Sequence, residues 1–159
     1  MKIIEYRAEY KQAVVELMAE LQEFERGLSH DRTPGESMAS GHIDYLLRLS
    51  ESREGKVYLV VNGMEVVGFA VVFLESEDED DLHLLPAYKR YGWVSDLIVK
   101  QNYRGSDAAP MLLNAAERHC ASVGVQQVKL SALHDNGRAL RFYQKAGYSP
   151  HEVILRKDL

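Results

Sequence analysis

Apolar side chains in the first third of the chain recur at steps of three and four residues. Over residues 8–26 this spacing predicts an amphipathic helix, and over the stretch that ends near Gly55 it predicts a second one. We expect a short strand at residues 2–6 before these helices, and a loop at residues 27–35 between them, where a Pro-Gly pair breaks the pattern. The inward-facing positions are Ala13, Val14, Leu17, Met18, Leu21 and Phe24 in the first helix and Ile43, Leu46 and Leu47 in the second.

The middle of the chain has the composition of β-strands. Residues 56–61 are rich in β-branched and aromatic side chains, and the Asn62-Gly63 pair that follows them is a strong signal for a tight hairpin. A second strand over residues 66–74 completes this hairpin and leads into an acidic stretch. A further strand is predicted over residues 88–99.

The second half of the chain alternates between helix and strand. The pattern predicts a helix over residues 107–123, closed by Gly124 as its C-cap glycine, and then a strand over residues 126–133. A helix over residues 136–146 and a final strand over residues 152–155 follow.

The resulting order of elements, β-α-α-β-β-β-α-β-α-β, indicates one α/β (α+β) domain over residues 1–159. The hairpin makes the first half of the sheet antiparallel, whereas the strand–helix–strand unit in the second half requires a parallel crossover. No internal repeat, linker or low-complexity tract divides the chain. We therefore expect one mixed sheet with helices on both of its faces.

The composition excludes several classes of protein. Hydrophobic residues make up 46% of the chain and charged residues 27%, which is typical of a soluble globular domain and excludes wholesale disorder or a fibrous repeat. No apolar run approaches the roughly 20 residues needed to cross a bilayer, and residues 2–7 are charged too early for a secretory signal. We expect a cytoplasmic protein with no membrane partner. The single cysteine, Cys120, excludes an intrachain disulfide, and the spacing of the six histidines predicts no metal site.

Negative charge is concentrated in residues 75–81, where six of seven side chains are acidic. Because the formal charge of the whole chain is −5, the remainder is nearly neutral. A nucleic-acid partner would require the opposite sign and is not expected. The segment is either a solvated loop that resists aggregation or a rim that attracts cationic substrates, and its residues leave both interpretations open.

A first segment that could carry chemistry is residues 99–113, where a strand enters a loop of small residues and a helix follows. The N–H groups of the first helical turn lack intrahelical acceptors, and the helix dipole is positive there. Small side chains would let a phosphate approach these groups, and Arg104 adds a full positive charge. The same spacing also fits an ordinary strand-to-helix turn.

A second segment is residues 133–148. Asn136 can cap a helix here, and Phe142, Tyr143 and Ala146 fall at intervals that suit packing. Taken alone, Tyr143 fits a half-buried core aromatic better than a catalytic residue.

Together these segments resemble the two signature motifs of the GNAT N-acetyltransferase superfamily, separated as expected by one helix and one strand. Residues 104–109, Arg-Gly-Ser-Asp-Ala-Ala, resemble the family's Arg/Gln-x-x-Gly-x-Gly/Ala loop for acetyl-CoA. Residues 136–148 are similar to its Asn-x-x-Ala-x-x-Phe-Tyr-x-x-x-Gly-Phe/Tyr helix. With the opening residues 3–8 and the order of elements, the resemblance covers nearly the whole chain.

The resemblance implies a splayed sheet that holds the pantetheine arm of acetyl-CoA, the co-substrate, between the parallel strands of residues 88–99 and 126–133. Main-chain groups at the end of the first strand would contact pantetheine and polarise the thioester carbonyl, and those of the following loop would hold the pyrophosphate. The cofactor contacts implied in this way are Leu97, Ile98, Val99, Gln101, Arg104, Gly105, Ser106, Asp107, Ala108, Ala109, Asn136, Arg138 and Tyr143.

The resemblance also implies that Tyr143 stands near the sulfur as general acid. A tyrosine with a pKa of about 10 can protonate a developing thiolate, because the pKa of a thiol is about 8.5. A primary amine is mostly protonated at pH 7, so its attack needs a base or a water chain. Asp96 matches an acid often found in relatives that act on small amines, although Ser95 replaces the glutamate frequent before it. Glu75 is a second candidate, and a solvent-facing or cation-paired strand acid is the alternative for Asp96.

Asp107 departs from the family pattern because the loop usually has glycine there. Its carboxylate can cap the helix and suit the helix dipole, but it would oppose a pyrophosphate if it pointed inward. We expect direct transfer of an acetyl group to a small cationic amine. A protein or peptide amine is the alternative acceptor, and a weakened fold used for CoA sensing or partner binding is the non-enzymatic alternative. The final strand offers a pairing edge for a homodimer.

Overall fold

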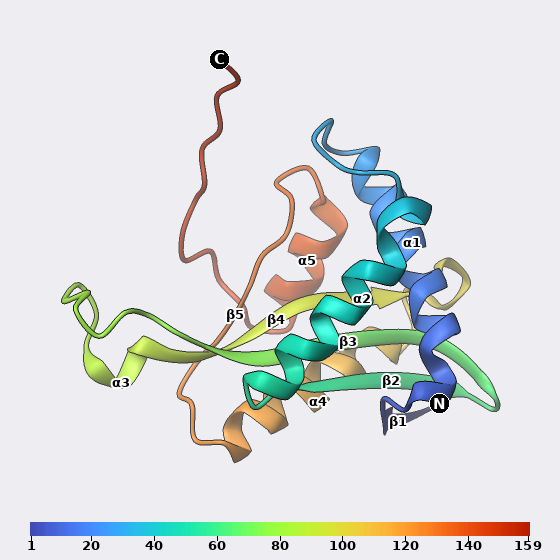
Figure 1. Ribbon diagram of the computed structural model, residues 1–159, viewed down its shortest axis with the longest axis horizontal. Helices are drawn as coiled ribbons and strands as arrows, with labels where there is room; N and C mark the ends of the chain where they lie inside the picture. The colour runs from blue at the N-terminus through green and yellow to red at the C-terminus, as the bar shows by residue number, and fades with distance from the viewer.

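A five-stranded mixed sheet forms the centre of the computed structural model, which describes residues 1–159. Its strands follow the order of the chain, with antiparallel pairing from β1 to β4 and parallel pairing between β4 and β5. Figure 1 shows the chain from its N-terminal strand to its extended C-terminal end. The strands are β1 (Lys2–Glu5), β2 (Lys56–Asn62), β3 (Glu65–Ser76), β4 (Arg90–Val99) and β5 (Val128–Leu130).

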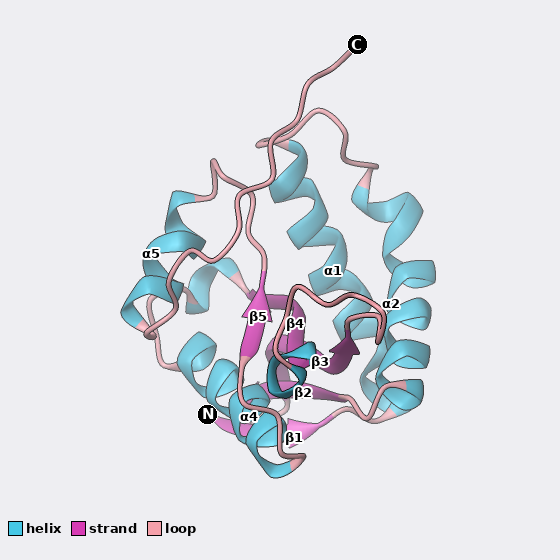
Figure 2. Cartoon of the chain, turned by 90° about the vertical axis from the view of Figure 1, so that its left-hand side faces the viewer, coloured by secondary structure: helices cyan, strands magenta, loops and turns pink.

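Helices cover both faces of this sheet, as Figure 2 shows most directly. The first two long helices pack on one face, and the fourth and fifth lie on the other. No helix combines the length and the apolar composition that crossing a bilayer would need. The helices are α1 (Lys11–Arg26), α2 (Gly35–Ser52), α3 (Pro86–Lys89), α4 (Ala108–Ser122) and α5 (Gly137–Lys145), with single 3₁₀ turns at Ala8–Tyr10 and Gln101–Tyr103.

The core is divided by the sheet into two parts. Strand β3 is buried continuously from Val66 to Leu74 because its alternating side chains enter both parts. Phe69 and Val71 pack against α1 and α2, whereas Val72 packs beneath α4. The predicted inward residues of the first two helices, except for Phe24, are buried in or packed against the part of the core beneath α1 and α2.

The Asn62-Gly63 turn joins β2 to β3 as the sequence predicted. Gly63 has φ of 63°, a left-handed conformation that glycine adopts without steric cost. Gly124, which follows α4, has φ of 82° and thus confirms the predicted glycine stop of that helix.

Strands β4 and β5 pair over only three positions and then separate. Gly92 lies opposite Val128, and the last pair is Val94 with Leu130, although β4 continues to Val99. A bulge lies at the point of separation, because the partners of β3 change from Val94 to Asp96 and leave Ser95 as an extra residue. Such a bulge bends its strand, so the fold contains the splay that the resemblance implied.

Three predicted elements differ from the structure. The first helix begins at Lys11, after the 3₁₀ turn, and the strand expected over residues 126–133 is reduced to β5. The predicted final strand over residues 152–155 is wrong, because residues 149–159 form neither helix nor strand and are exposed throughout. The composition of this segment favours a strand, but a strand also requires a neighbour that accepts its hydrogen bonds, and the segment pairs with no strand of the sheet.

Gly92 permits the close approach of α4 to the start of the β4–β5 pairing. A Cβ atom at this position would overlap Sγ of Cys120, which is buried in α4. We expect Gly92→Ala to lower the free energy of unfolding by about 1–3 kcal/mol, measured by urea denaturation. A control, Gly41→Ala, places its Cβ in open space within α2 and should raise stability by up to about 1 kcal/mol.

Gly92→Ala should destabilise the protein less when Cys120 is also replaced by alanine. Removing Sγ deletes the atom that overlaps the new methyl group, so Gly92→Ala should cost less in the Cys120→Ala background than in the wild type. An equal cost in both backgrounds would contradict this account of Gly92.

Candidate active site

The candidate site begins at the part of β4 that has lost β5 as its neighbour. From Asp96 to Val99 this strand is paired with β3 on one side only. Ile98 and Val99 are buried, and Leu97 packs against the core beneath α4. Their side chains are therefore occupied by packing, and it is the main chain of this stretch that remains for a ligand.

The loop after β4 leads directly into the N-terminus of α4. Gly105 has φ of 80°, so the turn relies on glycine. The Ser106 hydroxyl donates to the carbonyl of Tyr103 at 2.6 Å and lies 3.3 Å from the Ala108 nitrogen, which donates to it. Ser106 therefore ties the loop to the first turn of α4.

The expectation that Asp107 caps α4 through its side chain is wrong. Asp107 occupies the N-cap position but makes no side-chain cap bond, because its backbone is already helical, with φ of −73° and ψ of −2°. Its side chain is exposed to solvent. The carboxylate therefore leaves the N–H groups of the first turn without an acceptor from Asp107.

Two arginines from separate motifs meet over one aromatic ring. The guanidinium carbon of Arg104 lies 5.8 Å from the ring centroid of Phe24, and that of Arg138 lies 4.8 Å from it. Burial, and after it the charge of Arg104, lowers the pKa of Arg138 from its ordinary value. Glu20 is the one carboxylate that pairs with either arginine, at 3.3 Å from Arg104. The cluster therefore carries excess positive charge that suits an anionic ligand.

Sequence reasoning placed Phe24 on the inner face of a helix and did not connect Glu20 with Arg104. Both residues belong to the C-terminal half of α1, which is far from either motif in the chain. Helical spacing shows that Glu20 and Phe24 share one face of α1. The spacing does not indicate that this face of α1 contacts Arg104 and Arg138.

Asp96 of β4 lies close to three further titratable groups, His42, Tyr143 and Glu25. Burial raises the pKa of Asp96, while a contact with Ser95 and the charge of His42 oppose that effect. Burial, and after it the negative charge of Asp96, raises the pKa of Tyr143 to about 12. Asp96 also contributes to a raised pKa of Glu25, which is caused mainly by burial and opposed by Arg32, 3.5 Å away. The structure thus brings Asp96 and Tyr143 into electrostatic reach, with Glu25 as a neighbour that sequence reasoning missed.

Aromatic contacts hold Tyr143 on α5. Its ring centroid lies 5.1 Å from that of Phe142 and 5.9 Å from that of Tyr148. The hydroxyl of Tyr148 donates to Glu117 of α4 at 3.0 Å, which ties the end of α5 to its neighbour. Tyr143 is half-buried, and its phenol stays protonated at neutral pH because its pKa is so far above 7.

Asn136 starts α5 as the sequence predicted. Its side-chain oxygen accepts a hydrogen bond from the backbone nitrogen of Ala139 at 3.1 Å. This bond satisfies one of the free N–H groups of the first turn and fixes the direction in which α5 leaves the loop.

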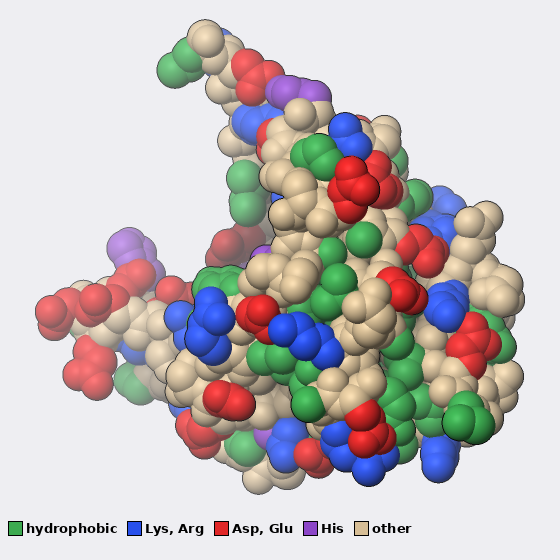
Figure 3. All heavy atoms as spheres, turned by 45° about the vertical axis from the view of Figure 1, so that its right-hand side comes forward, with side chains coloured by type: hydrophobic (Ala, Val, Ile, Leu, Met, Phe, Trp, Pro, Cys, Tyr) green, Lys and Arg blue, Asp and Glu red, His purple; other side chains and the backbone are tan.

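Glu75 does not join this group. It pairs with Arg53 and lies opposite Tyr91 in the sheet, whereas Asp96 lies opposite Val71, roughly 13 Å farther along β3. The acidic segment that begins at Glu75 leads into a loop that projects from the body of the protein (Figure 3). Two of its acids pair with cations, Glu75 with Arg53 and Glu77 with Lys129, and Asp81 contacts the ring of His83.

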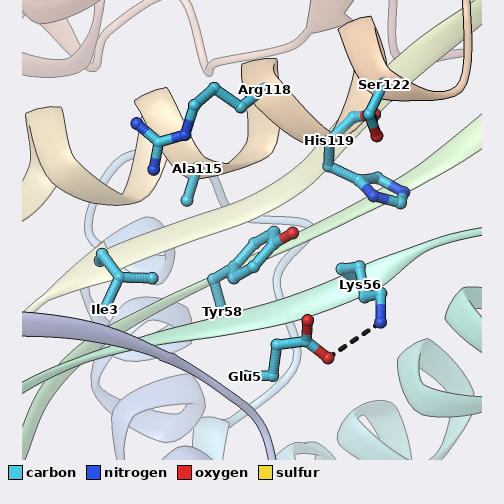
Figure 4. A pocket seen from close by; sticks show the side chains of 8 residues that line it. All are labelled: Ile3, Glu5, Lys56, Tyr58, Ala115, Arg118, His119 and Ser122. Atoms are coloured by element: carbon cyan, nitrogen blue, oxygen red, sulfur yellow. Dashed lines mark hydrogen bonds and ion pairs between the residues drawn. The ribbon is translucent and has the colours of Figure 1, made fainter.

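A pocket of about 360 Å³ lies elsewhere, between the β1–β2 edge of the sheet and α4. Figure 4 shows its lining side chains, among them Lys56, which forms an ion pair with Glu5 at 2.9 Å, and Arg118 and His119 of α4. None of the residues expected to bind the cofactor or to act in catalysis lines it. No group of three or more His, Cys, Asp or Glu side chains is arranged to hold a metal ion.

Comparison with known proteins agrees with this geometry. A model of the acetyltransferase (GNAT) family matches residues 15–148, which is most of the chain and includes both motifs. The chain belongs to the GNAT acetyltransferase family. No curated protein sequence matches the chain.

Solved structures with the same fold span nearly the whole length of the chain. A transcriptional regulator from Bacillus halodurans C-125 has a TM-score of 0.76 at 16% identity, with 99% of each chain covered. An aminoglycoside 6'-N-acetyltransferase from Acinetobacter haemolyticus has a TM-score of 0.72 at 14% identity, covering 100% of this chain and 98% of the other. An aminoglycoside acetyltransferase from an uncultured soil sample has a TM-score of 0.68 at 16% identity, covering 99% and 94%. These similarities establish the fold.

Replacing the cap of α5 should loosen the helix that carries Tyr143. We expect Asn136→Ala to lower the free energy of unfolding by about 1 kcal/mol, because the N–H group of Ala139 loses its acceptor. Asn136→Asp, which keeps an acceptor oxygen, should retain most of that stability in the same urea titration. If both variants lost the same amount, the hydrogen bond would not be the reason.

Proposed function

We propose that this protein transfers the acetyl group of acetyl-CoA to the amine of a small cationic molecule. The observation that carries the proposal is the separation of β4 from β5 beside two oppositely charged groups of side chains. Arg104 and Arg138 lie over Phe24 of α1, and Asp96 lies near Glu25 of the same helix. An anionic cofactor and a cationic acceptor would thus each find side chains of complementary charge.

The residues present fit acetyl-CoA. The side of β4 that β5 leaves free from Ser95 to Ile98 can pair with an extended amide-containing arm, and the N–H groups that follow Gly105 can hold a phosphate. The Val99 carbonyl already accepts from Nε of Arg104 at 3.3 Å. The cluster of Arg104 and Arg138 supplies positive charge beside them. Asp107 is exposed and makes no side-chain bond to the first turn of α4, so it does not occupy the N–H groups that would hold the phosphate.

Asp96 would act as the general base and Tyr143 as the general acid. Acetyl-CoA supplies a thioester that a neutral amine can attack directly, so the acceptor must first lose a proton. Asp96, whose pKa is raised, is better suited to accept that proton than an ordinary carboxylate. Tyr143 remains protonated at neutral pH and can donate its proton to the departing sulfur.

The acceptor class rests on the carboxylates. Glu25 is half-buried beside Asp96, so an ammonium or hydroxyl group of the acceptor would find two oxygen-rich side chains in one place. The aminoglycoside acetyltransferases among the structural neighbours act on small molecules that carry several amines, which supports the same class. The acidic loop beyond Glu75 projects away and is not needed for this recognition.

Calorimetric titration with acetyl-CoA tests the cofactor. We expect the wild type to bind, and Arg138→Ala to raise the dissociation constant about tenfold or more at low salt, because a charge-assisted contact to phosphate is lost. Arg141→Ala removes the same charge from the exposed side of α5 and should have little effect. Absence of binding by the wild type, or equal weakening by both variants, would contradict the assignment.

A thiol-release assay over a panel of small amines tests the catalytic roles. Tyr143→Phe and Asp96→Asn should each lower kcat about 100-fold or more without changing the dissociation constant of acetyl-CoA. Tyr88→Phe, at an exposed tyrosine of α3, is the control.

The pH dependence of the same reaction reports on Asp96. Because burial raises the pKa of this carboxyl, the wild type should lose activity as the pH falls through that raised value and the base becomes protonated. Asp96→Asn should remove this acidic limb and leave the dependence that the acceptor amine imposes. A profile unchanged by Asp96→Asn would show that another group accepts the proton.

A further inference from the structure

The pocket between the β1–β2 edge of the sheet and α4 is formed by strand side chains below and helix side chains above (Figure 4). Ile3 and Glu5 of β1 and Tyr58 of β2 point to the same face of the sheet, because Glu5 is paired directly with Tyr58 and Ile3 lies two residues before Glu5. Above them α4 presents only the small side chain of Ala115, so a space of about 360 Å³ remains beneath the helix.

The inner wall of this pocket is apolar. Ile3 and Tyr58 pack against the buried side chains of Val60 and Leu112, and Ala115 is itself buried. The wall is therefore continuous with the core beneath α4. A cavity of about 150 Å³ is large enough to bind benzene, so this pocket has room for a ring of that size with a polar substituent.

The charges that line the pocket do not balance. Glu5 is the only carboxylate in the lining, and it pairs with Lys56 at 2.9 Å, so Arg118 of α4 is left without a carboxylate partner. Two cations and one carboxylate leave one positive charge in excess. A guanidinium group binds a carboxylate particularly well, because its N–H groups can form two parallel hydrogen bonds to the two oxygens.

The hydroxyl of Tyr58 lies within electrostatic reach of all three charged side chains. Burial is the main cause that raises the pKa of Tyr58, the charge of Glu5 raises it further, and Lys56 and Arg118 lower it. The phenol therefore stays protonated at neutral pH and is available as a hydrogen-bond donor beside the guanidinium of Arg118.

His119 closes the pocket toward the start of β2. Its Nε2 lies 2.6 Å from the carbonyl oxygen of Glu54, and because a carbonyl can only accept, this nitrogen carries the proton. Glu54 has φ of 49°, a left-handed conformation that is uncommon for glutamate. The hydrogen bond ties α4 to the turn before β2, so this end of the pocket is fixed before any ligand binds.

We propose that this pocket binds a small organic monocarboxylate, with the carboxylate between Arg118 and the Tyr58 hydroxyl and the apolar body against Ile3 and Ala115. One negative charge neutralises the excess charge of the lining, whereas Arg118 would repel a cation. The site is separate from the one proposed for acetyl-CoA, because Arg118 follows Ala108 by ten residues, which is about 15 Å along α4. This inference does not depend on the proposed function.

Titration of the ¹⁵N-labelled protein with benzoate, followed by two-dimensional NMR, tests the site without acetyl-CoA. We expect saturable shifts with a dissociation constant of about 0.1–1 mM at low salt, largest for the amides of Ile3, Tyr58 and Arg118. Amides of residues 104–109 should not shift. Benzamide, which has the same shape without the charge, should bind at least about tenfold more weakly.

Two variants test the groups assigned to the carboxylate. Arg118→Gln removes the charge and should raise the dissociation constant of benzoate about tenfold or more, and Tyr58→Phe, which removes one neutral donor, should raise it about threefold. Arg48→Gln makes the same change at an exposed position of α2, on the other face of the sheet, and should leave the constant unchanged. Circular dichroism should show all three variants folded.

The proposal would be overturned by the absence of saturable shifts around the pocket, or by shifts centred on residues 104–109. Equal binding of benzamide and benzoate would also overturn it, as would equal weakening by Arg118→Gln and Arg48→Gln, because the charge of Arg118 would then not hold the ligand. None of these measurements uses acetyl-CoA, so failure of this site and failure of the proposed function are distinguishable.

Discussion

The separation of β4 from β5 after Val94 is the constraint on which the rest of the structure depends. The bulge at Ser95 turns β4 away from its neighbour, while Gly92 lets α4 lie close enough to cover the paired part. Beyond the bulge, Ile98 and Val99 keep both faces of the strand packed. The strand therefore stays rigid while one side of its main chain lacks a partner, a combination that favours a ligand able to form hydrogen bonds.

Helix α1 contacts both of the charged groups beside this gap. Glu20 and Phe24 position the arginines that suit an anionic cofactor, and Glu25, one residue further, faces Asp96. Because adjacent residues of a helix project about 100° apart, one turn of α1 can border both groups. The cofactor and the acceptor would thus both lie against α1, which would hold their reacting atoms close to each other.

The two residues proposed for proton transfer lie on elements that differ in how deeply they are buried. Asp96 stands on a central strand, whereas Tyr143 belongs to α5, which buries none of its residues. Elements with few buried contacts open at low free-energy cost. Tyr143 therefore belongs to an element that opens more easily than the strand that carries Asp96.

The sequence by itself determined the family, the helices α1, α2, α4 and α5, the hairpin at Asn62-Gly63 and the cap at Asn136, because each depends on spacing or turn chemistry within a few residues. Only the tertiary structure decided what α1 contributes to the site, that Asp107 does not cap α4, that Glu75 lies apart from Asp96, and that residues 152–155 form no strand. These outcomes depend on which surfaces meet across the fold, and a strand in particular exists only where another edge accepts its hydrogen bonds.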